Sequence, residues 1–108
     1  MKNENMLQPI IKKKIPQIIE LFKAHNVIRA YAFGSVCTKN FNKKSDIDLL
    51  IAFQNGIDPL QKGQSIWDLE DALMEIFHRK IDLLTENQLK NPYLIESINK
   101  SKQLIYEA

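Results

Sequence analysis

The sequence of 108 residues lacks the features that mark several classes of protein. Its single cysteine, Cys37, excludes an internal disulfide and a multi-cysteine zinc site, and it suits a reducing compartment. Three glycines and four prolines leave no linker or low-complexity tract, so we expect one domain over residues 1–108. The longest apolar run, residues 49–53, is too short to span a membrane. No apolar segment of a secretory signal follows Met1, and we therefore expect a cytoplasmic protein.

An excess of charge of one sign is missing as well. The 15 Lys and Arg residues against 13 Asp and Glu residues give a net charge of only +2, too little to indicate direct nucleic-acid binding. Apolar residues make up 44% and charged residues 26%, as in soluble globular proteins, which argues against intrinsic disorder. These proportions predict an ordinary folded domain.

Hydrophobic periodicity predicts alternating helices and strands. Residues 9–25 show the spacing of an amphipathic helix, either in two pieces or kinked, because Pro16 lies inside it. Two further helices are expected, one beginning at a potential capping box of Ser65 and Asp68 and one over about residues 92–100. Four segments have the composition of strands, namely Val27–Phe33, Asp46–Phe53, Lys80–Thr85 and Gln103–Tyr106. This order predicts an α/β domain with helices covering one face of the sheet.

The most informative pattern is Gly34-Ser35, then ten residues, then Asp46 and Asp48, with Asp82 on the next expected strand. Alternation along a strand places Asp46 and Asp48 on one face, with roughly 7 Å between their Cα atoms. Neighbouring carboxylates repel each other unless a cation lies between them, and hard oxygen ligands suit Mg²⁺. Asp82 would be a third ligand, or the base that takes a proton from an attacking hydroxyl. Two such ions would act on the attacking and leaving oxygens of an in-line displacement.

The segment before these aspartates suits a phosphate. Gly34 and Ser35, between a strand and a helical turn, let the backbone approach a phosphate closely. Backbone N–H groups of the turn can then bind its oxygens. The side chains of Lys39, Lys43 and Lys44 lie in the loop before the first aspartate and are candidates to reach the same phosphates.

Each part of this pattern also has a simpler structural interpretation. The three aspartates could be a strand-end group facing water, and Gly34-Ser35 could be a plain strand-to-helix cap. Neither interpretation explains why charges interrupt two apolar strands at a fixed distance after Gly-Ser, because burying a charge is costly unless it is paired or binds a metal. The combination therefore predicts a site.

Several residues outside the pattern have two possible roles. Cys37 is expected to be a small buried residue. Trp67 lies off the apolar stripe of its helix, either at the edge of the core or as an anchor for a partner. The tyrosines at 31, 93 and 106 are expected to pack within the core and the strands.

At these residues the chain resembles the minimal nucleotidyltransferases, a small branch of the DNA polymerase β-like superfamily. The resemblance rests on Ala32-Phe33-Gly34-Ser35, on Ser45-Asp46-Ile47-Asp48-Leu49-Leu50 and on Lys80-Ile81-Asp82-Leu83-Leu84. It implies a mixed sheet of about four strands flanked by helices, and transfer of AMP from ATP to a hydroxyl acceptor. In that interpretation Gly34 and Ser35 hold the triphosphate, Asp46 and Asp48 bind two Mg²⁺ ions, and Asp82 completes one ion and orients the acceptor.

The resemblance also implies a partner. Family members of this size are commonly antitoxins encoded beside a HEPN-domain toxin, and some silence that toxin by adenylylating a tyrosine. A domain this small has little chain left for an acceptor pocket, so a partner or a second copy of the chain is expected to complete it.

One position departs from the family and keeps alternatives open. Members often read Gly-Ser-x-Ala-Arg-Gly, and here Thr38 stands where the arginine would be. The first alternative is an antitoxin that neutralises its toxin by binding only. The second is a transferase that modifies a small molecule such as an aminoglycoside, although those enzymes usually carry an added substrate domain.

Overall fold

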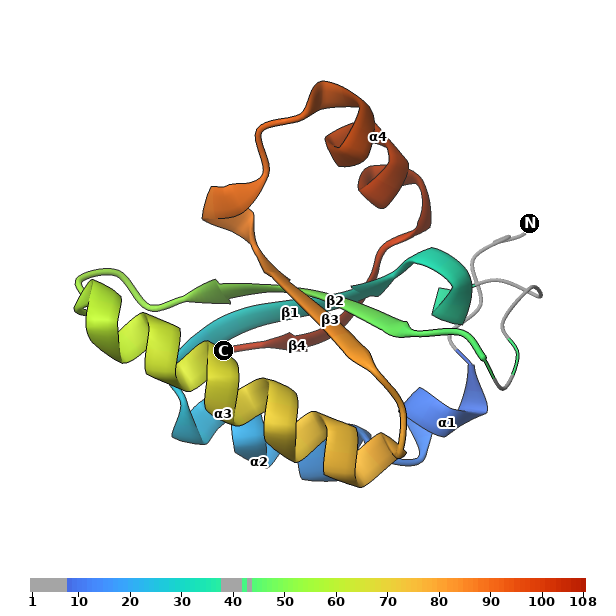
Figure 1. The fold of residues 1–108 in the computed structure, drawn as a ribbon, viewed down its shortest axis with the longest axis horizontal. Helices are drawn as coiled ribbons and strands as arrows, with labels where there is room; N and C mark the ends of the chain where they lie inside the picture. Colours follow the sequence, from blue (N-terminus) through green and yellow to red (C-terminus); the bar gives the residue numbers. More distant parts are fainter. Residues whose placement is uncertain (1–7, 38–41, 43) are drawn as a thin grey trace.

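The computed structural model describes residues 8–37, 42 and 44–108, and within them helices and strands alternate (Figure 1). Their order is α1 (Pro9–Lys12), α2 (Ile15–Ala24), β1 (Val27–Phe33), the short 3₁₀ turn η1 (Gly34–Cys37), β2 (Ile47–Phe53), α3 (Pro59–Phe77), β3 (Ile81–Thr85), the 3₁₀ turn η2 (Glu86–Gln88), α4 (Pro92–Ser101) and β4 (Gln103–Glu107). The four predicted strands are confirmed. The first predicted helix forms in two pieces, and Pro16 lies in the first turn of the second, where a missing N–H costs little.

The four strands form one mixed sheet in the order β3-β2-β1-β4. Strand β1 pairs antiparallel with both β2 and β4, whereas β2 and β3 run parallel. The parallel pair is connected through α3, as a parallel connection requires. The mixed sheet that the family resemblance implied is therefore confirmed, and β3 and β4 are its edges.

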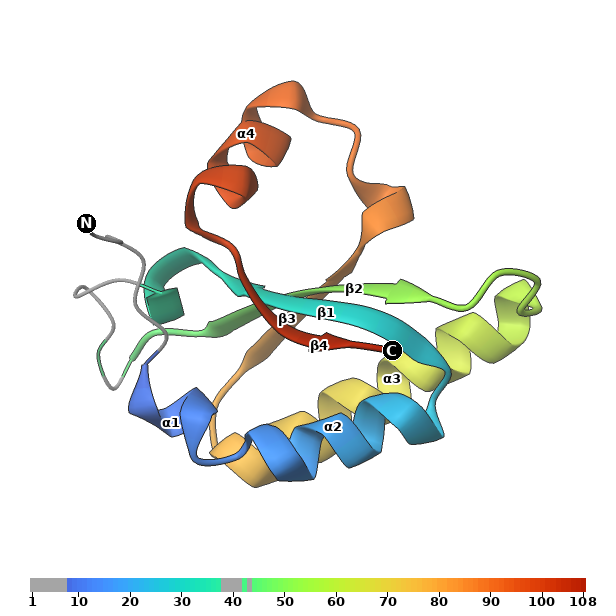
Figure 2. The ribbon, with the colours of Figure 1, turned by 180° about the vertical axis from the view of Figure 1, so that it is seen from behind.

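Two helices form the expected layer on one face of the sheet. Figures 1 and 2 show α2 and α3 side by side below the strands, with α4 on the opposite side. The core between the sheet and this layer is large and apolar, with Phe22, Ile51 and Leu69 among its buried side chains. On the other face, α4 contributes Ile98 to a smaller cluster with Phe33 and Leu50.

Helix α3 begins earlier than predicted. Its N-cap is Asp58, whose side chain accepts hydrogen bonds from two backbone N–H groups of the first turn, at 3.0 and 3.3 Å. Pro59 follows in the first turn, where its fixed φ favours the helix. The predicted capping box at Ser65 and Asp68 is wrong, since Ser65 is buried in the middle of the helix.

Two aromatic side chains lie outside the core. Trp67 is 68% exposed, which excludes the core-edge alternative. Tyr93 is 84% exposed, so the prediction that all three tyrosines pack inside is wrong for this one. Tyr106 stacks on Phe22 with ring centroids 5.9 Å apart, and Tyr31 is half-buried. Among the helices of the described residues, none is both long and apolar enough to cross a membrane.

Candidate active site

The sheet brings two of the three predicted aspartates together. Asp48 in β2 and Asp82 in β3 are direct neighbours in the parallel register. Asp46 lies immediately before β2 and two residues from Asp48, so strand alternation directs it to the same face. The intervening Ile47 is buried in the main core, which places the three aspartates on the α4 face. The same alternation that fills the core therefore gathers the carboxylates.

The central carboxylate of this group is electrostatically strained. Asp48 is half-buried, whereas Asp46 and Asp82 are exposed. Burial, together with the smaller effects of the charges of Asp82 and Asp46, raises the pKa of Asp48 to about 6. Such a cluster gains stability when positive charge is placed beside it.

Gly34 creates the space in which Asp48 lies. At the end of β1, Phe33 pairs with Asp48, and Gly34 follows with a φ of +74°. A Cβ atom at this position would lie 2.5 Å from Oδ2 of Asp48. Both the left-handed backbone and the close carboxylate therefore require glycine.

A residue of α4 completes this turn, and sequence reasoning missed it. The backbone N–H of Gly34 donates a hydrogen bond to Oγ of Ser101 at 3.1 Å. Ser35 and the rest of η1 continue directly from this point, so the predicted strand-to-turn geometry is present. The contact links residues 67 positions apart, and no local pattern around Ser101 announces it.

Arg79 is a second residue that sequence reasoning missed. Its Nη1 donates hydrogen bonds to the backbone carbonyls of Asn42 and Ser45, at 2.7 and 2.9 Å. The Oγ of Ser45 also accepts a hydrogen bond from the Asn42 N–H at 3.0 Å. These contacts fix the backbone that leads into Asp46.

Of the three predicted lysines, Lys44 lies in this segment of the described residues. Its side chain is exposed. Lys39, Lys43 and Thr38 lie outside the described residues.

The chemistry of this group fits a divalent cation. Three carboxylates supply the hard oxygen donors that Mg²⁺ prefers, and a cation would relieve the repulsion around Asp48. Within the described part of the chain, no three His, Cys or carboxylate side chains are already arranged as a metal cage.

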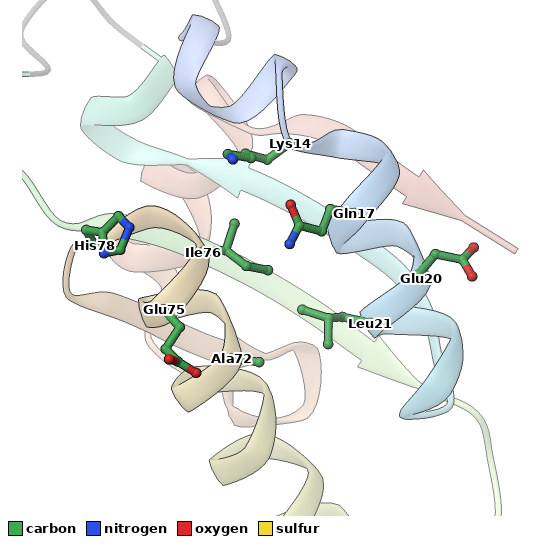
Figure 3. A pocket seen from close by; sticks show the side chains of 8 residues that line it. All are labelled: Lys14, Gln17, Glu20, Leu21, Ala72, Glu75, Ile76 and His78. Carbon is green, nitrogen blue, oxygen red and sulfur yellow. The ribbon is translucent and has the colours of Figure 1, made fainter.

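Two concave surfaces lie away from the aspartates. A groove of about 660 Å³ runs between α2 and α3, where Leu21 and Ile76 point toward each other (Figure 3). A cavity of about 630 Å³ is lined by Arg29 and Glu86, which form a bidentate ion pair at 2.8 and 3.0 Å. Neither is lined by an aspartate of the predicted site, and their size alone does not outweigh the chemistry of the carboxylate group.

Comparison with known proteins agrees with the fold. The family model described as "Polymerase beta, Nucleotidyltransferase" matches residues 16–108. Two Methanocaldococcus jannaschii proteins, both provisionally named protein adenylyltransferases, are 32% and 31% identical to this chain. Each alignment spans 106 residues, which is 98% of this chain and 99% of the relative.

Solved structures share the same architecture. One, provisionally described as a minimal nucleotidyltransferase, has a TM-score of 0.67 at 27% identity and covers 86% of this chain and 90% of its own. A chain of a toxin–antitoxin structure with AMP-PNP has a TM-score of 0.68 at 19% identity, covering 87% and 73%. A chain of a complex between a tri-AMPylated Shewanella oneidensis HEPN toxin and an MNT antitoxin has a TM-score of 0.63 at 18% identity, covering 90% and 72%. The last two likenesses concern the fold.

Proposed function

The chain belongs to the polymerase beta nucleotidyltransferase family, and on that premise we propose that it is a Mg²⁺-dependent protein adenylyltransferase that acts as an antitoxin. It transfers AMP from ATP to a hydroxyl group, that of a tyrosine on a partner HEPN toxin, with release of pyrophosphate and of the hydroxyl proton. The observation that carries the proposal is the half-buried Asp48, placed against Gly34 and beside Asp82. The provisional names of the relatives support protein as the acceptor, and the toxin complexes among the fold neighbours support the partner.

Each predicted residue has a defined task in this proposal. Asp46, Asp48 and Asp82 would hold Mg²⁺, and the ion would supply positive charge to neutralise the phosphates. Asp82, exposed on the edge strand, also orients the acceptor hydroxyl. The backbone of Gly34 and Ser35 lies against the triphosphate, and Lys44 neutralises it from the adjacent loop. Lys39 and Lys43 have the same predicted task.

The nucleotide site can be tested without knowing the acceptor. We expect calorimetric titration to show ATP binding by the wild-type chain in the presence of Mg²⁺ and much weaker binding in its absence. The double variant Asp46→Asn/Asp48→Asn should lose the Mg²⁺-dependent part. Asp68→Asn on α3 is a matched control, since its exposed side chain accepts from Gln64 at 3.0 Å through an oxygen that asparagine keeps. ATP binding that is indifferent to the double substitution would contradict the proposed site.

The transfer step is tested separately with the toxin co-expressed and purified. Incubation with ATP and Mg²⁺ should add the mass of AMP to a toxin tyrosine, and Asp48→Asn should abolish this addition. If the toxin is neutralised equally by wild type and Asp48→Asn with no mass added, the chain is an antitoxin that acts by binding only.

A further inference from the structure

Helix α3 exposes a line of large apolar side chains. Leu60, Trp67 and Met74 are 85%, 68% and 43% exposed. They are seven residues apart, so they lie along the same side of the helix. The opposite side carries Leu69 and Leu73, which are fully buried against the sheet. Exposed tryptophan at the centre of such a line is typical of interfaces rather than of free surface. We refer to these three side chains as the α3 stripe.

The α3 stripe lies on the flank of the helix that faces away from α2. Ala72 and Ile76 line the groove toward α2, so they mark the other flank (Figure 3). Glu70 is three residues after Trp67 and four before Met74, and the charge of Asp82 acts on its carboxyl group. Since Asp82 belongs to the edge strand β3, the α3 stripe borders that edge.

Most of the charged residues along the stripe are acidic, and Lys62 is the one cation of the sequence between Leu60 and Met74. Residues 63–77 contain four carboxylates and no lysine or arginine, although the whole chain has a net charge of +2. The carboxylates are Asp68, Glu70, Asp71 and Glu75. Burial and the charges of Asp82 and Asp71 raise the pKa of Glu70, which shows that these groups crowd one another. Two copies of α3 placed face to face would double this repulsion. An occupant with lysine or arginine would relieve it.

We propose that the α3 stripe is a docking surface for an amphipathic helix of a partner protein, with apolar residues at heptad spacing bordered by Lys or Arg. The stripe spans 14 residues of helix, or about 21 Å, which matches about four turns of a partner helix. Resting on the proposed function, this partner is the protein that bears the acceptor hydroxyl. Docking on α3 brings it to the strand that carries Asp82.

Trp67 reports on this surface directly, because it is the only tryptophan of the chain. The full chain is titrated, without nucleotide, with a helical peptide of about 21 residues that has leucine at heptad positions and flanking lysines. A second peptide keeps the leucines and has flanking glutamates. We expect a saturable blue shift of Trp67 emission with the lysine peptide, at least about tenfold tighter than with the glutamate peptide.

Three double variants locate the binding surface. Glu70→Gln/Asp71→Asn, beside the stripe, should weaken the lysine peptide severalfold. Glu20→Gln/Glu96→Gln removes the same charge from exposed positions of α2 and α4, away from the stripe, and should have little effect. Leu60→Ser/Met74→Ser changes only exposed positions and should remove most of the binding.

Three results would overturn the proposal. They are an unchanged emission with the lysine peptide, equal affinity for both peptides, or a blue shift on concentrating the chain alone with matching dimer formation in sedimentation. The last result would assign the stripe to a second copy. ATP titration of the same sample is independent of this readout, so failure of the docking surface and failure of the nucleotide site are distinguishable.

Discussion

The two faces of the sheet are built for different purposes. In the described part of the chain, the face under α2 and α3 packs against a continuous apolar core that includes side chains from every strand. The α4 face has a much smaller cluster around Ile98, and beside it lie the half-buried Asp48 and the glycine turn. Stability is therefore concentrated on one face, and the other tolerates carboxylates whose repulsion disfavours the fold. Substitutions should separate the two faces. Those on the core face should mainly lower the free energy of unfolding, and those on the α4 face should mainly change nucleotide binding.

Truncation in the main core should produce the largest change in stability. Leu69 is fully buried between α3 and the sheet, so Leu69→Ala removes apolar contacts and leaves a cavity. We expect the free energy of unfolding to fall by about 2–5 kcal/mol, measured by chemical denaturation. Under conditions where the variant is folded, its affinity for Mg²⁺ and ATP should equal that of the wild type. A parallel loss of affinity would show that the two faces are coupled.

Gly34→Ala should mainly weaken the binding of Mg²⁺ and ATP, and should lower the free energy of unfolding less than Leu69→Ala does. The left-handed φ costs a non-glycine residue about 1–2 kcal/mol, and the new Cβ would displace the end of the Asp48 side chain. Because that carboxylate is the central one of the site, the affinity for Mg²⁺ and ATP should fall about 10- to 100-fold. Calorimetry and denaturation on the same protein measure both effects. Wild-type affinity in this variant would mean that Asp48 does not take part.

Two carboxylates, Asp48 and Glu86, should respond to pH with opposite signs. The pKa of Asp48 is raised to about 6, so its ionisation destabilises the fold increasingly as pH rises through that value. The Arg29 guanidinium lowers the pKa of Glu86, so this ion pair stabilises the fold above the ordinary glutamate pKa and is lost as pH falls through the lowered one. In metal-free buffer, Asp48→Asn should stabilise the protein above about pH 6 and lose that advantage in acid. Glu86→Gln should destabilise it at neutral pH, with the difference fading in acid. Chemical denaturation over a range of pH tests both predictions. A change in stability of the same sign for both variants at neutral pH would contradict the assigned pKa shifts.

Local patterns predicted the strands and the carboxylate group well for a physical reason. Strand alternation is a two-residue property, so the apolar Ile47 and Leu49 around Asp48 already imply which face it occupies. The role of Arg79 depended instead on the chain folding back over 34 residues to Ser45, which no local spacing encodes. The start of α3 was misplaced because Ser65 and Asp58 are both plausible caps, and tertiary burial of Ser65 decided between them. The exposure of Trp67 could not be predicted for the same reason. Periodicity shows that its side chain lies off the apolar stripe of the helix, but only the packing of the folded chain shows how exposed it is.

The smallest predicted effect concerns the end of α3, one of the helices that cover the core face of the sheet. His78 ends α3 with a φ of +54°, a left-handed conformation that disfavours a residue with a Cβ atom. His78→Gly should stabilise the protein by about 0.5–1 kcal/mol, since glycine relieves this strain and the backbone N–H still bonds to the Met74 carbonyl. Asn26 has a φ of +64° after α2 and is a matched control, because asparagine tolerates this conformation and Asn26→Gly should gain less. Both variants should bind Mg²⁺ and ATP as the wild type does, since they change the ends of the helices that cover the core face. A gain at Asn26 equal to that at His78 would show that the strain is not specific to histidine, and a change in nucleotide affinity would show that the helical layer also controls the site.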